Sequence, residues 1–137
     1  MYESLTAYLP RLQNIEYGKW IIDKENDGTP EHPIRAPFVA YSKEVDEFVD
    51  SIYSFVDSHE EMGLRQYFSI LEAAGILAEI GKMKDPVVSA LDGRTVMALL
   101  VLTVRAERFC DGALLNRLEE GLITRCLLRL KEIDGGK

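Results

Sequence analysis

An apolar stretch in the last third of the chain, VMALLVLTV at residues 96–104, decides the fold. A helix that is apolar all round must be covered by neighbouring elements on most of its surface. We therefore predict a central helix that starts near Arg94, runs through this stretch and ends near Phe109. The stretch is about half the length needed to cross a bilayer, so it predicts a buried helix and no membrane span.

Around this helix the sequence predicts a mainly α fold, a single compact bundle of about six helices with a small β-hairpin near residues 18–41. The clearest helix begins after Ser42, a good N-cap, and carries an apolar stripe from Val45 to Val56. Residues 17–22 and 38–41 are rich in aromatic and β-branched side chains, which favours two strands. Other helical patterns cover residues 5–12 with a break near Leu9 caused by Pro10, 64–74 after a polar linker at 58–63, 76–84, 85–91, 114–118 and 123–130.

The length of 137 residues suits one domain over 1–137, with a frayed tail at 134–137. The net charge of −7 would repel nucleic acid, which is therefore not an expected partner. Two cysteines without framework spacing, and no signal peptide, indicate a soluble cytoplasmic protein with free thiols.

The charge is distributed unevenly along the chain. Residues 1–93 hold 8 Lys/Arg and 17 Asp/Glu, a net charge of −9, whereas residues 94–137 hold 8 Lys/Arg and 6 Asp/Glu, a net charge of +2. Either the two portions dock and partly neutralise each other, or the C-terminal portion holds a site for an anion.

The octapeptide RAERFCDG at residues 105–112 places four charges at the end of the apolar helix. Charges near a core need partners, since an unpaired buried charge costs several kcal/mol. In a structural interpretation, Arg105 and Arg108 clamp carboxylates or carbonyls elsewhere. In a functional one, the arginines hold an anion while Glu107 and Asp111 orient or catalyse. A surface for a partner protein is the third interpretation.

Several further residues bear on function. Trp20, with Tyr17 and Tyr41, would line the mouth of a pocket or close an edge of the core. We expect Cys110 to be a small buried thiol rather than a nucleophile, and Gly112 to close the helix in a left-handed conformation. His32 and His59 form no spaced ligand pair, so neither a metal nor a cofactor is expected.

The octapeptide resembles the closing motif of an uncharacterised bacterial domain family of unknown function, with the form Arg-Ala-acidic-Arg-Phe-Cys-acidic-Gly. Gly121 and the segment RLK at 129–131 occupy the places that follow in that family, and GKW at 18–20 and YS at 41–42 also resemble it. The resemblance implies a small, mainly helical domain. It implies no activity, substrate or cofactor.

We therefore expect a non-enzymatic module that binds a small anionic ligand or a protein partner around residues 105–112, with Trp20 nearby, and that forms a homodimer in one version of this hypothesis. The absence of a recognisable catalytic constellation motivates it. The alternative is a small enzyme acting on an anionic metabolite or nucleotide. In that case Arg105 and Arg108 hold the anion, and Glu107 or Asp111 serves as acid or base.

Overall fold

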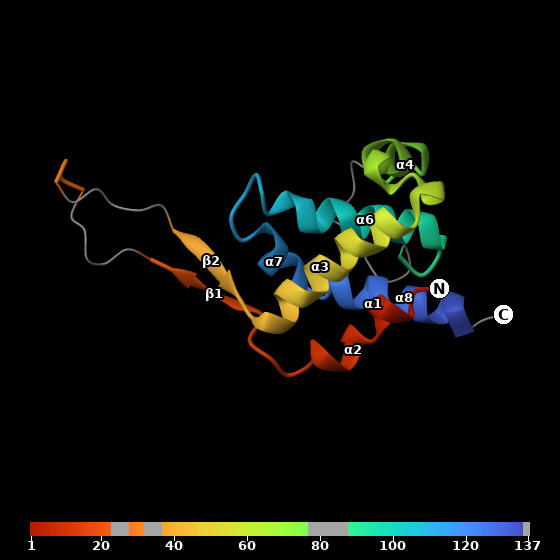
Figure 1. Ribbon diagram of the computed structural model, residues 1–137, viewed down its shortest axis with the longest axis horizontal. Coiled ribbons are helices and arrows are strands. Elements are labelled where there is room, and N and C mark those ends of the chain that lie inside the picture. Colours follow the sequence, from red (N-terminus) through yellow and green to blue (C-terminus); the bar gives the residue numbers. More distant parts are fainter. Residues whose placement is uncertain (23–27, 32–36, 77–87, 136–137) are drawn as a thin grey trace.

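The computed structural model describes residues 1–22, 28–31, 37–76 and 88–135, and it is mainly helical with one small sheet (Figure 1). This confirms the predicted fold class. The elements are α1 (Glu3–Thr6), α2 (Tyr8–Arg11), β1 (Gly18–Ile21), β2 (Phe38–Tyr41), α3 (Lys43–Ser58), the short 3₁₀ helices η1 (Glu60–Met62) and η2 (Leu64–Gln66), α4 (Tyr67–Ala73), α6 (Gly93–Ala106), α7 (Ala113–Glu119) and α8 (Leu122–Gly135). The helix predicted at 76–84 lies outside the described residues except for Ile76. Of the helix predicted at 85–91 only residues 88–91 are described, where Val88 is helical and a turn follows.

Helix α6 is the centre of the fold and packs against α3, α4, α7 and α8. Asp92 caps its start, because its carboxylate accepts from the backbone N–H of Thr95 at 2.8 Å. Its side chains from Thr95 to Val101 are all buried. Fully burying one Val, Leu or Met side chain stabilises a fold by about 1.5–3 kcal/mol, so this helix is a main source of stability.

The end of α6 differs from the prediction. The regular helix stops at Ala106 instead of near Phe109, and the chain tightens into turns in which the N–H groups of Arg108 and Phe109 donate to carbonyls three residues back. Phe109 and Cys110 consequently lie on the surface. The expectation of a buried Cys110 is therefore wrong, because the turn carries it off the covered part of the helix. The other thiol, Cys126, is buried in α8, and burial raises its pKa to about 12.

The helix predicted after Ser42 is α3, and the predicted N-cap is confirmed. The Ser42 hydroxyl accepts from the N–H of Val45 at 3.4 Å, and Val45, Phe48 and Ile52 are fully buried on the inner face. Glu44 and Asp46 lie in the first turn, where the helix dipole favours negative charge. α3 thus buries its predicted stripe against the core and leaves its acidic face in water.

The predicted break caused by Pro10 occurs at Ala7, between α1 and α2, instead of near Leu9. Proline has no N–H to donate to the carbonyl four residues earlier, so the helical ladder lacks the bond to Thr6. The interruption therefore falls one turn before the proline, and Pro10 itself lies inside α2.

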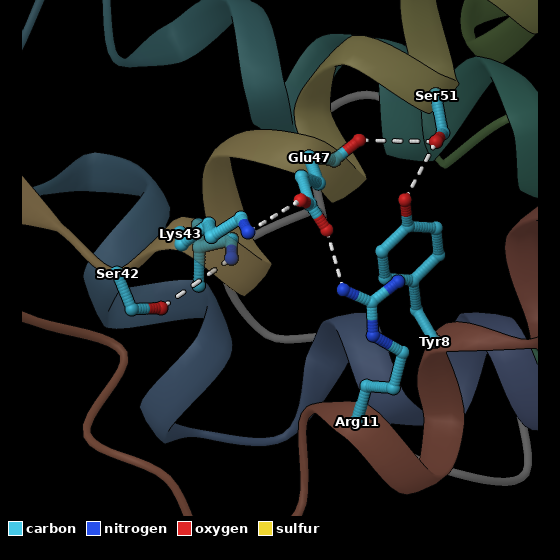
Figure 2. Close-up of polar contacts among 7 residues, drawn as sticks. Tyr8, Arg11, Ser42, Lys43, Glu47 and Ser51 are labelled. Atoms are coloured by element: carbon cyan, nitrogen blue, oxygen red, sulfur yellow. Dashed lines mark hydrogen bonds and ion pairs between the residues drawn. The ribbon is translucent and has the colours of Figure 1, made fainter.

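Polar side chains tie α2 to the exposed face of α3 (Figure 2). Arg11 donates to the carboxylate of Glu47, and Ser51 donates to the hydroxyl of Tyr8 at 3.1 Å. The Arg11 guanidinium holds the pKa of Glu47 below its usual value. Exposed ion pairs contribute little stability, so this network fixes the orientation of α2 but adds little to the free energy of unfolding.

The hairpin projects from the helical body (Figure 1) and pairs β1 with β2 in antiparallel register, Gly18 with Tyr41 and Trp20 with Val39. Side chains alternate between the two faces of a strand, so Trp20, Val39 and Tyr41 share one face. Val39 is buried and Tyr41 is half-buried, so this is the face that packs on the helices. The hairpin therefore presents Trp20 and Tyr41 to the end of α6.

The start of the chain lies beside α8, because Asp134 accepts from the backbone N–H of Tyr2 at 2.8 Å and pairs with the amino group of Met1. α8 continues to Gly135, so the first two residues of the predicted tail are helical. The helix predicted at 123–130 is part of α8, and its apolar residues at helical spacing, Ile123, Cys126, Leu127 and Leu130, are fully buried. Across the described segments of the chain, no helix has the length and apolar character needed to cross a membrane.

Candidate functional site

The carboxylate of Glu107 is the most heavily bonded polar group at the end of α6. It accepts from the hydroxyl of Tyr41 at 2.7 Å, from the N–H of Gly112 at 3.0 and 3.1 Å, and from the N–H of Leu114 at 3.0 Å. The first N–H groups of a helix have no partner within the helix, and at the start of α7 Glu107 accepts from Leu114 and from the N-cap residue Gly112. Glu107 thus joins the end of α6, the start of α7 and strand β2.

Tyr41 extends the same network. Its hydroxyl donates to Glu107 and accepts from the N–H of Leu115 at 3.0 Å. Burial and the hydrogen bond to Glu107 raise the pKa of Tyr41, so that the phenol stays protonated and remains a donor. This contact between residues 41 and 107 fixes the hairpin to the helices.

Only glycine suits position 112, because of both the backbone conformation there and the close packing of Trp20. Its φ of 89° lies in the left-handed region, as predicted, but Gly112 is the N-cap of α7 and does not close α6, which ends at Ala106. An added Cβ would also lie 2.4 Å from Cζ2 of Trp20, so the indole covers the glycine directly. Trp20 is still 46% exposed. In the structure it covers the loop that Glu107 organises.

The two arginines of the octapeptide contact tyrosine rings. The guanidinium of Arg105 lies 5.7 Å from the ring centroid of Tyr67, and that of Arg108 lies 5.6 Å from the ring centroid of Tyr53. Among the described residues neither guanidinium makes an ion pair or a hydrogen bond, and Nε of Arg105 is buried with no acceptor. The arginines therefore do not make the hydrogen bonds that the clamp interpretation predicted, and the carboxylate of Glu107 makes the polar contacts between the elements here.

Two cavities meet at Arg108 and Tyr53, which line both. The arginine cavity, of about 550 Å³, lies between α3, η2, α4 and α6; the polar and aromatic side chains that line it include Tyr53, Asp57, Arg65, Gln66, Tyr67, Phe68, Ser69, Arg105 and Arg108. The acidic cavity, of about 490 Å³, lies between α3, β2 and the end of α6; its lining includes Tyr41, Asp46, Asp50, Tyr53, Glu107 and Arg108. The two cavities differ chiefly in the charge of their walls.

The charges of the arginine cavity favour an anion. Three arginines line it against one carboxylate, Asp57, which pairs with Arg65 at 2.8 Å. Arg105 and Arg108 then add two positive charges in a chain whose net charge is −7. A cleft of one charge sign concentrates ligands of the opposite sign.

The acidic cavity has the opposite character. Asp46 and Asp50 lie one helical turn apart on α3, where like charges repel each other. Burial and the charge of Asp50 raise the pKa of the Asp46 carboxyl. The charge of the cavity walls therefore changes from acidic beside Asp46 to basic beside Arg105.

The other two predicted site residues lie apart from the arginine cavity. Asp111 is exposed in the turn before α7 and lines neither cavity, and Trp20 lies over Gly112. Tyr53 and Tyr67, which contact the arginines, were expected only as parts of apolar stripes. A local sequence pattern could not predict these contacts, because Tyr67 is 38 positions from Arg105 and Tyr53 is 55 positions from Arg108. Within the described part of the chain, no three His, Cys, Asp or Glu side chains are grouped to hold a metal ion.

Comparison with known proteins gives a family. Residues 67–135, just over half of the chain, match the model of a family of unknown function, DUF6508. The chain belongs to this family. No curated protein and no solved structure matches it. The match covers α4, α6, α7 and α8, with both arginines and Glu107, whereas β1, β2 and α3, which supply Trp20, Tyr41 and Tyr53, precede it.

Proposed function

We propose that this protein is a non-enzymatic binding module for a small anionic ligand, held in the arginine cavity by Arg105 and Arg108. One observation carries the proposal: both guanidiniums line the same cavity and, among the described residues, neither is neutralised by a carboxylate. A guanidinium fork matches the oxygens of phosphate or carboxylate in pairs, so two of them one turn apart suit such a group. A volume of about 550 Å³ falls in the range of about 300–1,000 Å³ usual for small-molecule sites.

The tyrosines support this role by holding the arginines in place. A guanidinium over an aromatic face loses part of its freedom before a ligand arrives, which reduces the entropic cost of binding. The N–H groups of both guanidiniums make no hydrogen bond among the described residues, so these donors remain available to a ligand. The exception is Nε of Arg105, which is buried.

The enzymatic alternative has weaker support. Glu107 already accepts from three donors, and a base needs a free lone pair close to the substrate. Asp111 lies outside both cavities. Acid or base catalysis by these two carboxylates therefore stays a prediction that the hydrogen bonds do not favour.

Calorimetric titration with pyrophosphate and citrate tests the proposed function. We expect saturable binding by the wild-type protein, weakened about ten-fold or more by Arg105→Gln and by Arg108→Gln. Arg117→Gln is the matched control, since it removes the same charge at a residue that pairs with Glu120 and lines neither cavity.

Both cavity variants should stay folded, because each loses only a contact to a ring worth about 0.5–1 kcal/mol. Absence of binding by the folded wild-type protein at millimolar ligand would contradict the proposal. Equal weakening by all three variants would contradict it as well, because it would show that only the overall charge matters.

A further inference from the structure

We infer that the anionic ligand carries a flat aromatic ring, which lies against Phe68 and Tyr67 at the α4 side of the arginine cavity. This rests on the proposed function and adds the chemical class of the ligand. The ring of Tyr67 joins the exposed side chain of Phe68 to the guanidinium of Arg105, and Arg108 lines the same cavity.

Phe68 is the first observation. It is a large apolar side chain that is 53% exposed, and it lines the arginine cavity. A single exposed phenylalanine is ordinary on a protein surface, but one that lines a cavity among polar groups gives a ligand apolar surface to bury. The neighbouring apolar residues of α4, Ile70 and Leu71, are buried in the core, so the exposure is specific to this position.

Tyr67 connects the charged and aromatic parts of the cavity. Its ring lies 4.8 Å from that of Phe68 at an angle of 32°, and 5.7 Å from the guanidinium of Arg105. A ligand whose ring meets Phe68 and Tyr67 would therefore place a directly attached anionic group near Arg105. An aliphatic anion would leave the aromatic surface wet, and an uncharged ring would leave the guanidiniums unpaired.

Two polar side chains flank this pair of rings. Gln66 precedes Tyr67, Ser69 follows Phe68, and both line the cavity. Neither side chain makes a hydrogen bond within the described part of the chain. Together they offer an amide and a hydroxyl to polar atoms on the edge of a ring. Heteroaromatic phosphates and aromatic carboxylates both fit this description, and what they share is a ring beside an anionic group.

Matched ligands separate this inference from the proposed function. Phenyl phosphate and cyclohexyl phosphate carry the same charge and rings of similar size, but only the phenyl ring is flat and aromatic. We expect the wild-type protein to bind phenyl phosphate about 3- to 10-fold more tightly in calorimetric titrations. Adenosine 5′-monophosphate against ribose 5-phosphate repeats the comparison with a heteroaromatic ring and should show the same direction.

Phe68→Leu should abolish the preference for the phenyl ring while leaving pyrophosphate binding unchanged, because leucine keeps an apolar side chain but has no ring. Phe38→Leu on β2 is the matched control, since Phe38 is 45% exposed and lines neither cavity. Equal affinity for phenyl and cyclohexyl phosphate, with pyrophosphate still bound, would overturn the inference and leave the proposed function standing. Failure of pyrophosphate and of all four esters to bind would overturn both.

Discussion

Removal of the Glu107 carboxylate should destabilise the protein without removing its ligand site. Glu107→Ala leaves the N–H groups of Gly112 and Leu114 and the hydroxyl of Tyr41 without their acceptor. The loss of a helix cap costs about 0.5–2 kcal/mol, and the loss of a hydrogen bond to a charged group costs about 1.5–3 kcal/mol when the donor stays buried. Because Glu107 is half-buried and water can replace part of these bonds, we expect a total loss of about 2–3 kcal/mol in the free energy of unfolding.

Glu107→Gln should cost less, about 1 kcal/mol. Oε1 accepts from Tyr41, Gly112 and Leu114, whereas Oε2 accepts only from Gly112. The amide oxygen of glutamine can replace Oε1, but its amino group faces the N–H of Gly112 and cannot accept. The three donors then keep one neutral acceptor in place of a charged one.

Urea denaturation measures these differences, with Glu119→Gln at the end of α7 as the control, because that exposed carboxylate makes no ion pair or hydrogen bond among the described residues. It should change the free energy of unfolding by less than about 0.5 kcal/mol. In the double variant Glu107→Ala/Tyr41→Phe, the loss of unfolding free energy should be smaller than the sum of the two single losses, because both substitutions remove the same hydrogen bond between Tyr41 and Glu107. A loss below about 0.5 kcal/mol for Glu107→Ala would refute the structural role, and a Glu107→Gln protein of normal stability that no longer binds pyrophosphate would indicate a direct role in binding.

Three further predictions concern residues near the two ends of α6. Gly112→Ala should lower the free energy of unfolding by about 2 kcal/mol or more, because it combines a left-handed φ with a clash against Trp20. Gly75→Ala is the control: its φ is 74° but nothing lies within 4 Å, so it should cost only about 1 kcal/mol for the backbone. Equal losses for the two variants in urea denaturation would refute the contribution of packing against Trp20. Cys110 should react with a thiol reagent in the native protein and Cys126 only after unfolding, so that two rapidly reacting thiols would contradict the burial of Cys126. Hydrogen bonds from Thr95 hold the pKa of Asp92 below its usual value near 3.8, so its charge stabilises the fold above pH 3.8 and that contribution fades as the pH falls further through the lowered pKa. The difference in unfolding free energy between wild type and Asp92→Asn should therefore be larger at pH 7 than at pH 3. A difference that grows on acidification would contradict the lowered pKa of Asp92.

Much of the scaffold could be predicted because its signals are local. The apolar stretch at 96–104, the N-cap at Ser42 and the stripe from Val45 to Val56 each specify a helix within one segment. The inner face of α8 followed from helical spacing in the same way. The hairpin was predictable from the strand-forming residues at 17–22 and 38–41.

The site was predictable only in part, because its partners are distant in the sequence. The octapeptide correctly located the site at the C-terminal end of α6. The contacts of its side chains, however, are made with Tyr41, Tyr53 and Tyr67, which lie on three other elements. Charge alone suggested that the arginines would find carboxylates. In the folded chain the carboxylate of Glu107 binds backbone N–H groups of the following turn, which requires the left-handed Gly112 to bring them round. The position of Cys110 was missed for the same reason, since nothing in the local pattern ends the helix at Ala106.

The side chains of the arginines themselves provide the most direct test of the central claim, that Arg105 and Arg108 hold an anion in the cavity they share. Correlation of the Nε–Hε groups by ¹H–¹⁵N NMR follows each arginine separately during titration with pyrophosphate, and single Arg→Gln variants assign the signals. We predict saturable shifts for Arg105 and Arg108 with one common dissociation constant, while Arg117 stays unchanged. Shifts confined to Arg117 and other arginines outside the cavity, or small linear changes shared by all of them, would contradict the account.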